Sequence, residues 1–107
     1  MLKSGDYDAV FSQARKFAQQ KFLLLVCKNE YNYSRLGLII AKKKVKLAVK
    51  RNRIKRIVRE SFRTQKLIKN LDVIFLAKKG INELTNQELR DKLSTLWEKI
   101  HVYYNSL

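Results

Sequence analysis

A block of cations is the part of this sequence whose residue types most directly predict a chemistry. Residues 41–63 hold eleven Lys or Arg and a single acid, Glu60, so ten of the fifteen net positive charges fall within them. Like charges on neighbouring turns of a helix repel each other by a few tenths of a kcal/mol per pair. A chain that keeps this repulsion is expected to bind an anion, and Arg suits bidentate binding of phosphate.

The same block is apolar at the spacing of a helix. Because an α-helix turns about 100° per residue, residues three and four apart share a face. One face carries Ile54, Ile57, Val58, Ser61 and Phe62. The opposite arc carries Asn52, Arg53, Lys55, Arg56, Arg59 and Arg63. A charge run is often only a solvated face, but these charges are of one sign, so we predict a helix that packs by one face and binds nucleic acid by the other.

The sequence offers few residues for catalysis by the polypeptide itself. A protein nuclease needs carboxylates that hold a metal ion, or a His that acts as a general base. The single His, His101, lies near the end of the sequence, and we expect it to be solvated. Asp6 and Asp8 form an Asp-x-Asp pair, which at the start of a predicted helix is better explained by capping than by metal binding. We therefore expect no catalytic residue and no metal site in the protein.

The composition predicts one folded domain, residues 1–107, in the cytoplasm. Its 46% hydrophobic content exceeds that of a disordered chain with a charge of +15. Cys27 is the single cysteine, so we expect a small buried thiol in a reducing compartment and no disulfide framework. The longest apolar run, 22–27, is too short to cross a membrane, and no secretory signal is recognisable.

Residues 4–18 predict a short N-terminal helix that is capped by Ser4 or Asp6. Tyr7 and Phe11 lie four residues apart and therefore share one side of this helix. From the residues alone, both rings are expected in the core. A short strand at 16–18 is an alternative for the end of the segment.

The rest of the chain predicts an α+β fold. Apolar runs at 22–28 and 35–42 are read as strands joined in a hairpin by the polar residues 29–34. A further strand at 72–78 follows the basic helix, which gives a β-α-β crossover, right-handed by the general rule. Thr85 and Glu88 form a capping box for a last helix, which is flanked by the staple Leu84 and Leu89. Its apolar stripe continues through Leu93, Leu96, Trp97 and Ile100, and Tyr103 and Tyr104 are expected to fray. The predicted order is α-β-β-β-α-β-α, around a four-stranded, mostly antiparallel sheet.

Several segments together resemble the protein subunit of bacterial ribonuclease P. The most specific is R-N-R-x-K-R-x-x-R at 51–59, within KRNRIKRIVRESFR at 50–63 and preceded by AKKKVKLAV. AKKGINEL at 77–84, DYDAVF at 6–11 and LWEKI near the C-terminus extend the resemblance over nearly the whole chain. It implies a left-handed crossover, which general rules do not predict.

The resemblance also implies a function. In such a ribonucleoprotein a catalytic RNA, with Mg²⁺ bound by the RNA, cleaves the phosphodiester bond that releases the 5′ leader of precursor tRNA. The protein is then an accessory subunit without bound cofactor, and its partners are this RNA and precursor tRNA, with no membrane and no DNA. Tyr7 and Phe11 are implied to line a cleft for the single-stranded leader. The implied contacts to the catalytic RNA are Lys43, Lys46, Arg51, Asn52, Arg53, Lys55, Arg56 and Arg59.

Two departures and two alternatives accompany this interpretation. The sequence begins only a few residues before the first helix, where many relatives have a longer basic segment, and Leu25 stands where some relatives offer a further aromatic ring. Arg51 lies near the apolar edge of its helix and is alternatively structural. A structural RNA-binding protein of ribosomal type would have the same composition. Binding of a basic amphipathic helix to membranes or DNA is disfavoured, because Ile54 and Ile57 commit the helix to a core.

Overall fold

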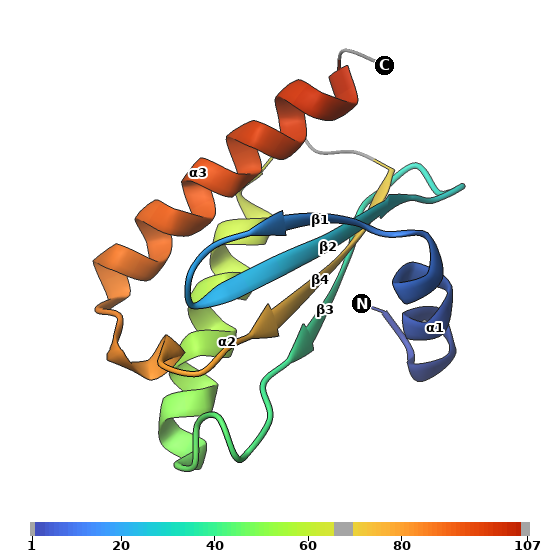
Figure 1. Cartoon of the computed structure of the whole chain (residues 1–107). Coiled ribbons are helices and arrows are strands. Elements are labelled where there is room, and N and C mark those ends of the chain that lie inside the picture. Colours follow the sequence, from blue (N-terminus) through green and yellow to red (C-terminus); the bar gives the residue numbers. More distant parts are fainter. Residues whose placement is uncertain (1, 66–69, 106–107) are drawn as a thin grey trace.

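The order of helices and strands agrees with the prediction. The structure is a computed structural model and describes residues 2–65 and 70–105. Its elements are α1 (Ser4–Gln13), β1 (Arg15–Ala18), β2 (Phe22–Lys28), β3 (Arg35–Ile39), α2 (Ala48–Arg63), β4 (Leu71–Ala77), the 3-10 turn η1 (Ile81–Glu83) and α3 (Asn86–Asn105). Figure 1 shows them as an α+β fold with helices on both sides of one sheet.

The predicted hairpin between residues 22–28 and 35–42 is wrong. The strand order is β1-β2-β4-β3, so β4 lies between β2 and β3. β2 pairs antiparallel with β4, whereas β3 pairs parallel with β4, Arg35 opposite Asp72. Burial explains the arrangement, because β4 is buried at six of its seven residues and only a central strand is paired at both edges and covered on both faces. Segment 29–34 instead passes the end of β4, where the Leu71 N–H donates to Ser34 Oγ at 3.2 Å.

The hairpin that does form joins β1 to β2, from Arg15 opposite Val26 to Ala18 opposite Leu23. The first helix is therefore shorter than the predicted 4–18: it ends at Gln13, and Ala14 is already extended, with ψ of 142°. The alternative short strand is confirmed and begins one residue earlier, at Arg15. Pairing satisfies backbone groups along the edge of β2 that a longer helix would leave open.

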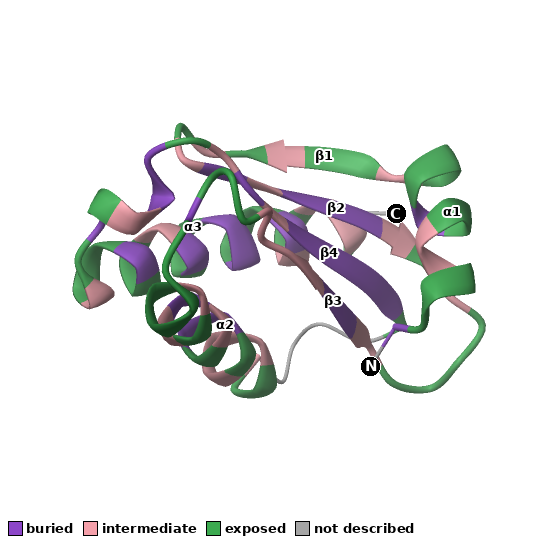
Figure 2. Ribbon diagram, turned by 90° about the horizontal axis from the view of Figure 1, so that it is seen from below, coloured by how far each residue is buried: buried purple, intermediate pink, exposed green. Residues whose placement is uncertain are grey.

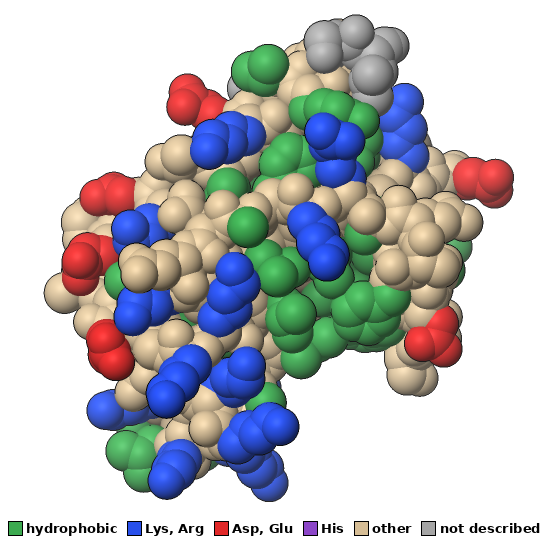
Figure 3. All heavy atoms as spheres, viewed as in Figure 1, with side chains coloured by type: hydrophobic (Ala, Val, Ile, Leu, Met, Phe, Trp, Pro, Cys, Tyr) green, Lys and Arg blue, Asp and Glu red, His purple; other side chains and the backbone are tan. Residues whose placement is uncertain are grey.

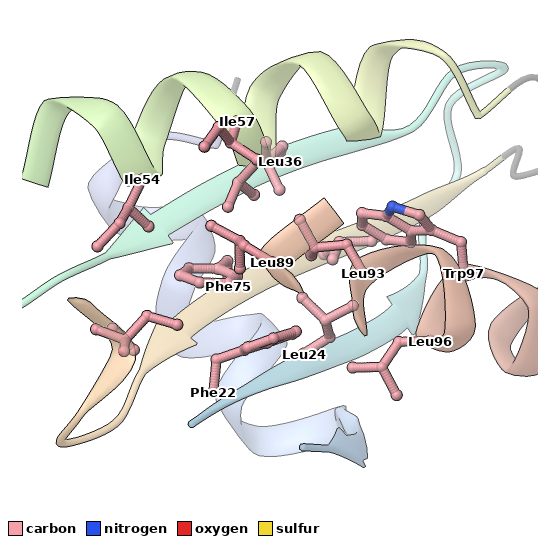
Figure 4. Close-up of a cluster of buried hydrophobic side chains, with 14 of the residues drawn as sticks. Phe22, Leu24, Leu36, Ile54, Ile57, Phe75, Leu89, Leu93, Leu96 and Trp97 are labelled. Atoms are coloured by element: carbon pink, nitrogen blue, oxygen red, sulfur yellow. The ribbon is translucent and has the colours of Figure 1, made fainter. Parts of the chain in front are cut away.

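The two faces of the sheet carry two separate cores. On one face α2 and α3 pack over β2 and β4, and Figure 4 shows Ile54 and Ile57 of α2 and Trp97 of α3 in this cluster. On the other face a smaller cluster joins Val10 of α1 to Leu25 and Ile74. Figure 2 shows the resulting burial along β2 and β4 and the more exposed outer strand β1. The nearly continuous hydrophobicity of these strands is thus explained by cover on both faces.

The start of α3 agrees with the prediction, whereas the end of α3 and the start of α1 do not. At the start of α3 the predicted capping box is present: the Glu88 N–H donates to Thr85 Oγ1 at 3.1 Å, and the Thr85 N–H donates to Glu88 Oε1 at 2.9 Å. Fraying at its end is wrong, because α3 continues to Asn105 and the Tyr104 hydroxyl donates to the Val26 carbonyl at 3.3 Å. The predicted cap of α1 at Ser4 or Asp6 is wrong: the N-cap is Lys3, whose backbone N–H donates to Asp6 Oδ2 at 2.8 Å.

The crossover from β3 through α2 to β4 connects parallel neighbours. The left-handedness of this crossover stays a prediction from the resemblance. The chain leaves β4 through Gly80, whose φ of +90° is costly for a residue with a Cβ atom. A Cβ atom there would also lie 2.6 Å from Lys21 Nζ, but that atom ends a flexible side chain that can move aside, so the backbone conformation is the reason for glycine at this position.

Candidate nucleic-acid interface

The apolar face of α2 lies where the sequence predicts it. Ile54, Ile57 and Val58 are completely buried, and the Trp97 indole N–H donates to Ser61 Oγ at 2.7 Å. Phe62 is half-buried, with its ring centroid 5.9 Å from that of Trp97. These contacts fix the rotation of the helix about its axis. The opposite arc must therefore point away from the core.

The cations of that arc have no carboxylate partner within the described ranges. Among residues 2–65 and 70–105 there are three ion pairs, and none includes a side chain of α2. We call the following set the α2 arc: the exposed Asn52, Arg56, Arg59 and Arg63, with the half-buried Lys55. In Figure 3 cations gather around the start of α2 and the segment before it. The predicted repulsion between the cations of α2 is thus not relieved by any carboxylate of the described residues.

Arg51 and Arg53 belong to the predicted RNA contacts but are engaged by the protein. Arg51 Nη1 donates to the carbonyls of Val45 and Lys46, each at 2.9 Å, which joins the helix to the segment that precedes it. This is the structural alternative considered for Arg51. Arg53 Nη1 donates to Asn86 Oδ1 and, at 3.4 Å, to the Leu84 carbonyl, and so ties α2 to the start of α3.

The segment before α2 carries two of the predicted contacts and two residues that sequence reasoning missed. Lys43 and Lys46 are both exposed, on either side of Val45, whose burial anchors the segment. Leu47 and Val49 are apolar yet 58% and 74% exposed. Val49 precedes Arg56 by seven residues and therefore lies on the same side of a helix. Had the predicted helix been extended one turn toward the N-terminus, Val49 would have been found among the cations.

Tyr7 and Phe11 lie on one side of α1, with ring centroids 6.4 Å apart. The prediction that both are core residues is only partly right, since Tyr7 is half-buried against the smaller core but Phe11 is 48% exposed. A Cβ atom on Gly37 of β3 would lie 2.6 Å from the Tyr7 hydroxyl oxygen, so this glycine gives the ring its place over the sheet. Leu25 is buried and adds no stacking surface.

Beside these rings the sheet presents an open apolar surface. Leu23, Leu76 and Ile39 are cross-strand neighbours on β2, β4 and β3, and all three are half-buried. Figure 3 shows apolar side chains gathered between α1 and the cation cluster. Aromatic and aliphatic surface next to cations is the composition of a site for single-stranded nucleic acid.

Arg35, at the start of β3, holds α1 and the sheet together. Its guanidinium donates to both oxygens of Asp72, at 2.8 and 2.7 Å, and to Asp6 Oδ2 at 3.3 Å. Asn29 Nδ2 donates to the same Asp72 at 2.8 Å. Burial raises the pKa of Asp72, but the hydrogen bonds from Arg35 and Asn29 outweigh it and lower that pKa overall. Sequence reasoning treated Asp6 as a cap alone; the apolar run around Asp72 was the available signal that this acid is buried.

Groups able to do acid–base or metal chemistry are sparse in the described ranges. Within them no group of three or more His, Cys, Asp or Glu side chains is arranged to hold a metal ion. His101, expected to be solvated, is half-buried and lies within 3.0 Å of the Asn105 amide nitrogen. Cys27, expected to be buried, is only half-buried; burial, followed by the charge of Asp72, raises the pKa of its thiol. No helix in the described ranges is both long and apolar enough to span a bilayer.

Comparisons with known proteins agree with this geometry. The family model described as "Ribonuclease P" matches residues 1–101. The protein component of ribonuclease P from Marinomonas sp. (strain MWYL1) is 46% identical over 102 residues, which are 94% of this chain and 77% of the relative. That from Legionella pneumophila (strain Lens) is 42% identical over 97% of this chain and 90% of the relative.

Solved structures of ribonuclease P proteins share the fold. The Staphylococcus aureus protein, at 27% identity, superposes with a TM-score of 0.85 over 94% of this chain and 93% of its own. The Thermotoga maritima protein, at 30% identity, gives 0.81 over 92% and 94%. The chain therefore belongs to the Ribonuclease P family, whose members are the protein components that partner the RNase P RNA in tRNA processing.

Proposed function

We propose that the α2 arc and the segment before it bind the catalytic RNA. The observation that carries this proposal is the row of cations on α2 with no carboxylate partner among the described residues. Guanidinium groups bind phosphate in bidentate fashion, and each neutralised phosphate releases counterions. The proposed contacts are Lys43, Lys46, Asn52, Lys55, Arg56 and Arg59, with Arg51 and Arg53 contributing from their anchored positions.

Asn52 has a different role in this proposal. It is exposed on the arc, and its amide both donates and accepts hydrogen bonds, whereas its neighbours only donate. Asn52 therefore recognises a particular RNA group, or a water on an RNA-bound metal ion, where the arginines neutralise charge.

The second proposed surface binds the 5′ leader of precursor tRNA. Tyr7 and Phe11 stand at the edge of the open apolar sheet surface, where unpaired bases can stack on them. Stacking on an aromatic ring contributes about 1–3 kcal/mol per base and does not depend on base identity. The protein thus holds leaders of many sequences while the RNA holds the body of the tRNA.

Cleavage itself is assigned to the RNA partner, with Mg²⁺ bound by the RNA. The chemistry of the two proposed RNA surfaces supports this division, because their amines, guanidiniums and aromatic rings bind RNA but do not hold Mg²⁺ and do not accept a proton at neutral pH. The polypeptide lowers the Mg²⁺ requirement by supplying positive charge where phosphates crowd together.

The test is cleavage of precursor tRNA at low Mg²⁺. Adding the protein to a bacterial RNase P RNA is expected to restore cleavage at the mature 5′ end. Replacing both rings, Tyr7→Ala with Phe11→Ala, should raise the KM of substrates that retain a leader by about tenfold or more. A substrate with a single-nucleotide leader serves as the matched control. Equal losses on both substrates would assign the rings to the core, and RNA binding without restored cleavage would favour a structural RNA-binding role.

A further inference from the structure

A second surface with the composition of an RNA site lies on the far side of α1 from Tyr7 and Phe11. Two cavities of about 360 and 550 Å³ open there, and both are lined by Gln13, Cys27 and Lys28, so they adjoin each other. Neither is lined by Tyr7 or Phe11. On a helical wheel Gln13 points about 120° away from Tyr7, so the helix separates this groove from the proposed leader surface.

Tyr31 lines one end of the groove, and Tyr33 lies beside it. Tyr31 and Tyr33 are 47% and 54% exposed, and their ring centroids are 5.3 Å apart. Their loop is held in place: Asn29 Oδ1 accepts from the Tyr31 N–H at 2.9 Å, and Asn29 Nδ2 donates to the Tyr33 carbonyl at 3.2 Å. The Arg35 guanidinium lies 4.5 Å from the centre of the Tyr31 ring. The rings are therefore ordered before any partner binds, which reduces the entropy lost on binding.

The other end of the groove combines rings with a cation. Arg15 lies 4.1 Å over the ring of Tyr103, and Tyr104 lies beside it, tied to Val26 by its hydroxyl. At each end of the groove, therefore, a guanidinium lies over a tyrosine ring: Arg35 over Tyr31 at one end and Arg15 over Tyr103 at the other.

The free charge along the groove is positive. Arg15 and Lys28 are exposed and take part in none of the ion pairs of the described residues. Of the two acids that line it, Asp72 is neutralised by Arg35, and Glu30 is exposed in the loop. The side-chain amide of Gln13 is engaged by no other described residue and can both donate and accept. The groove therefore offers rings for bases, cations for phosphates and an amide for a base edge or a ribose.

We infer that this groove, which we call the tyrosine groove, binds a second stretch of single-stranded RNA. Bases stack on Tyr31 and Tyr33, Lys28 contacts a phosphate in the middle of the groove, and Arg15 contacts a phosphate at the Tyr103 end. Rings that alternate with cations are the means by which proteins hold single strands without reading their sequence. A second copy of the chain is a poorer occupant, since two molecules of net charge +15 repel each other.

The test measures binding of hexauridylate to the full-length protein and maps it with 5-iodouridine photocrosslinks. Crosslinks are expected at Tyr31 or Tyr33 as well as at Tyr7 or Phe11. Replacing the pair, Tyr31→Ala with Tyr33→Ala, should abolish the first set, keep the second, and weaken hexauridylate binding at the tyrosine groove about 5- to 100-fold. The matched double variant Tyr7→Ala with Phe11→Ala should do the reverse.

Two further variants keep the test decisive. Tyr33→Ala alone leaves the contact between Arg35 and Tyr31 in place, so it is used if the double variant melts at a lower temperature. Lys28→Ala should weaken groove binding, whereas Lys79→Ala, an exposed lysine beyond the end of β4, should not. Unchanged crosslinking and affinity in the tyrosine variants would overturn the inference. Self-association that disappears in them would instead assign the groove to contacts between copies. Either result leaves the leader and cleavage tests untouched, because those depend on Tyr7 and Phe11.

Discussion

Arg35 and the α2 arc use the same kind of charge in opposite ways. The side chain of Arg35 is 14% exposed and that of its partner Asp72 is 7% exposed, and two carboxylates converge on this one guanidinium. The arc carries four cations, and no carboxylate among the described residues pairs with them. A buried charge must be paired to be tolerated, whereas an exposed one remains available to a partner. The placement of acids therefore distinguishes Arg35, which holds the fold, from the cations of the arc, which we propose bind RNA.

This difference also predicts how each region responds to solution conditions. Exposed, unpaired cations are screened by salt over about 8–10 Å at moderate ionic strength, and a buried pair is screened much less. Acid has the reverse selectivity, because it removes the charge of Asp72 and leaves the guanidinium groups of the arc unchanged. Salt should thus act on RNA binding, and acid on the fold.

The largest expected effect is that of salt on RNA affinity. If about six phosphates are neutralised, affinity for the catalytic RNA should fall about 10³-fold or more between 50 and 200 mM salt. Filter binding or fluorescence anisotropy at several salt concentrations gives the slope, and melting temperatures at the same concentrations show whether the fold is affected. A flat salt response would mean that the exposed cations are not the main RNA contacts.

The second effect is loss of stability when the buried pair is broken. Asp72→Asn should lower the free energy of unfolding by about 3 kcal/mol, because it leaves Arg35 buried beside a neutral partner. Urea titration measures this. Asp8→Asn removes the same charge from an exposed position on α1 and serves as the control.

The same pair predicts a pH dependence. The pKa of Asp72 is lower in the folded protein than in the unfolded chain, where it is about 3.9. Its contribution to stability is therefore present in full above that value and is lost as the pH falls through the lower, folded-state pKa. The Asp72→Asn protein should lose less stability than the wild type on acidification, and identical acid unfolding of both would contradict the role of this pair.

Much of the fold could be predicted from the sequence because it depends on local periodicity. The capping box of Thr85 and Glu88 and the buried face of α2 follow from spacings of three and four residues. The pairing of strands could not be predicted in the same way, since it depends on which strand reaches the centre of the sheet. Because 22–28 and 35–42 are close in sequence, they were predicted to pair as a hairpin. In the structure the buried strand β4, Leu71–Ala77, lies between them.

The candidate site shows the same limit. Which arginines share a face of α2 follows from their spacing alone. Whether one of them is free depends on atoms distant in sequence: Arg53 meets Leu84 and Asn86, more than 30 positions away, and Arg35 meets Asp72. Tyr31 and Tyr33 were read only as parts of a loop, because nothing in their spacing reveals that Arg35 and Asn29 hold them.

The smallest expected effect separates two arginines on a single helix. Arg53→Ala and Arg56→Ala remove the same charge one turn apart, and each should weaken binding of the catalytic RNA several-fold. Only Arg53→Ala should also destabilise the protein, by about 1 kcal/mol, because only Arg53 is bonded to the start of α3. Paired RNA-binding curves and urea titrations measure both quantities. If the two variants were equally stable, the contact of Arg53 would contribute nothing to the fold, and Arg53 would join the exposed set. If Arg56→Ala were the less stable protein, the assignment of exposed and anchored cations on α2 would have to be reversed.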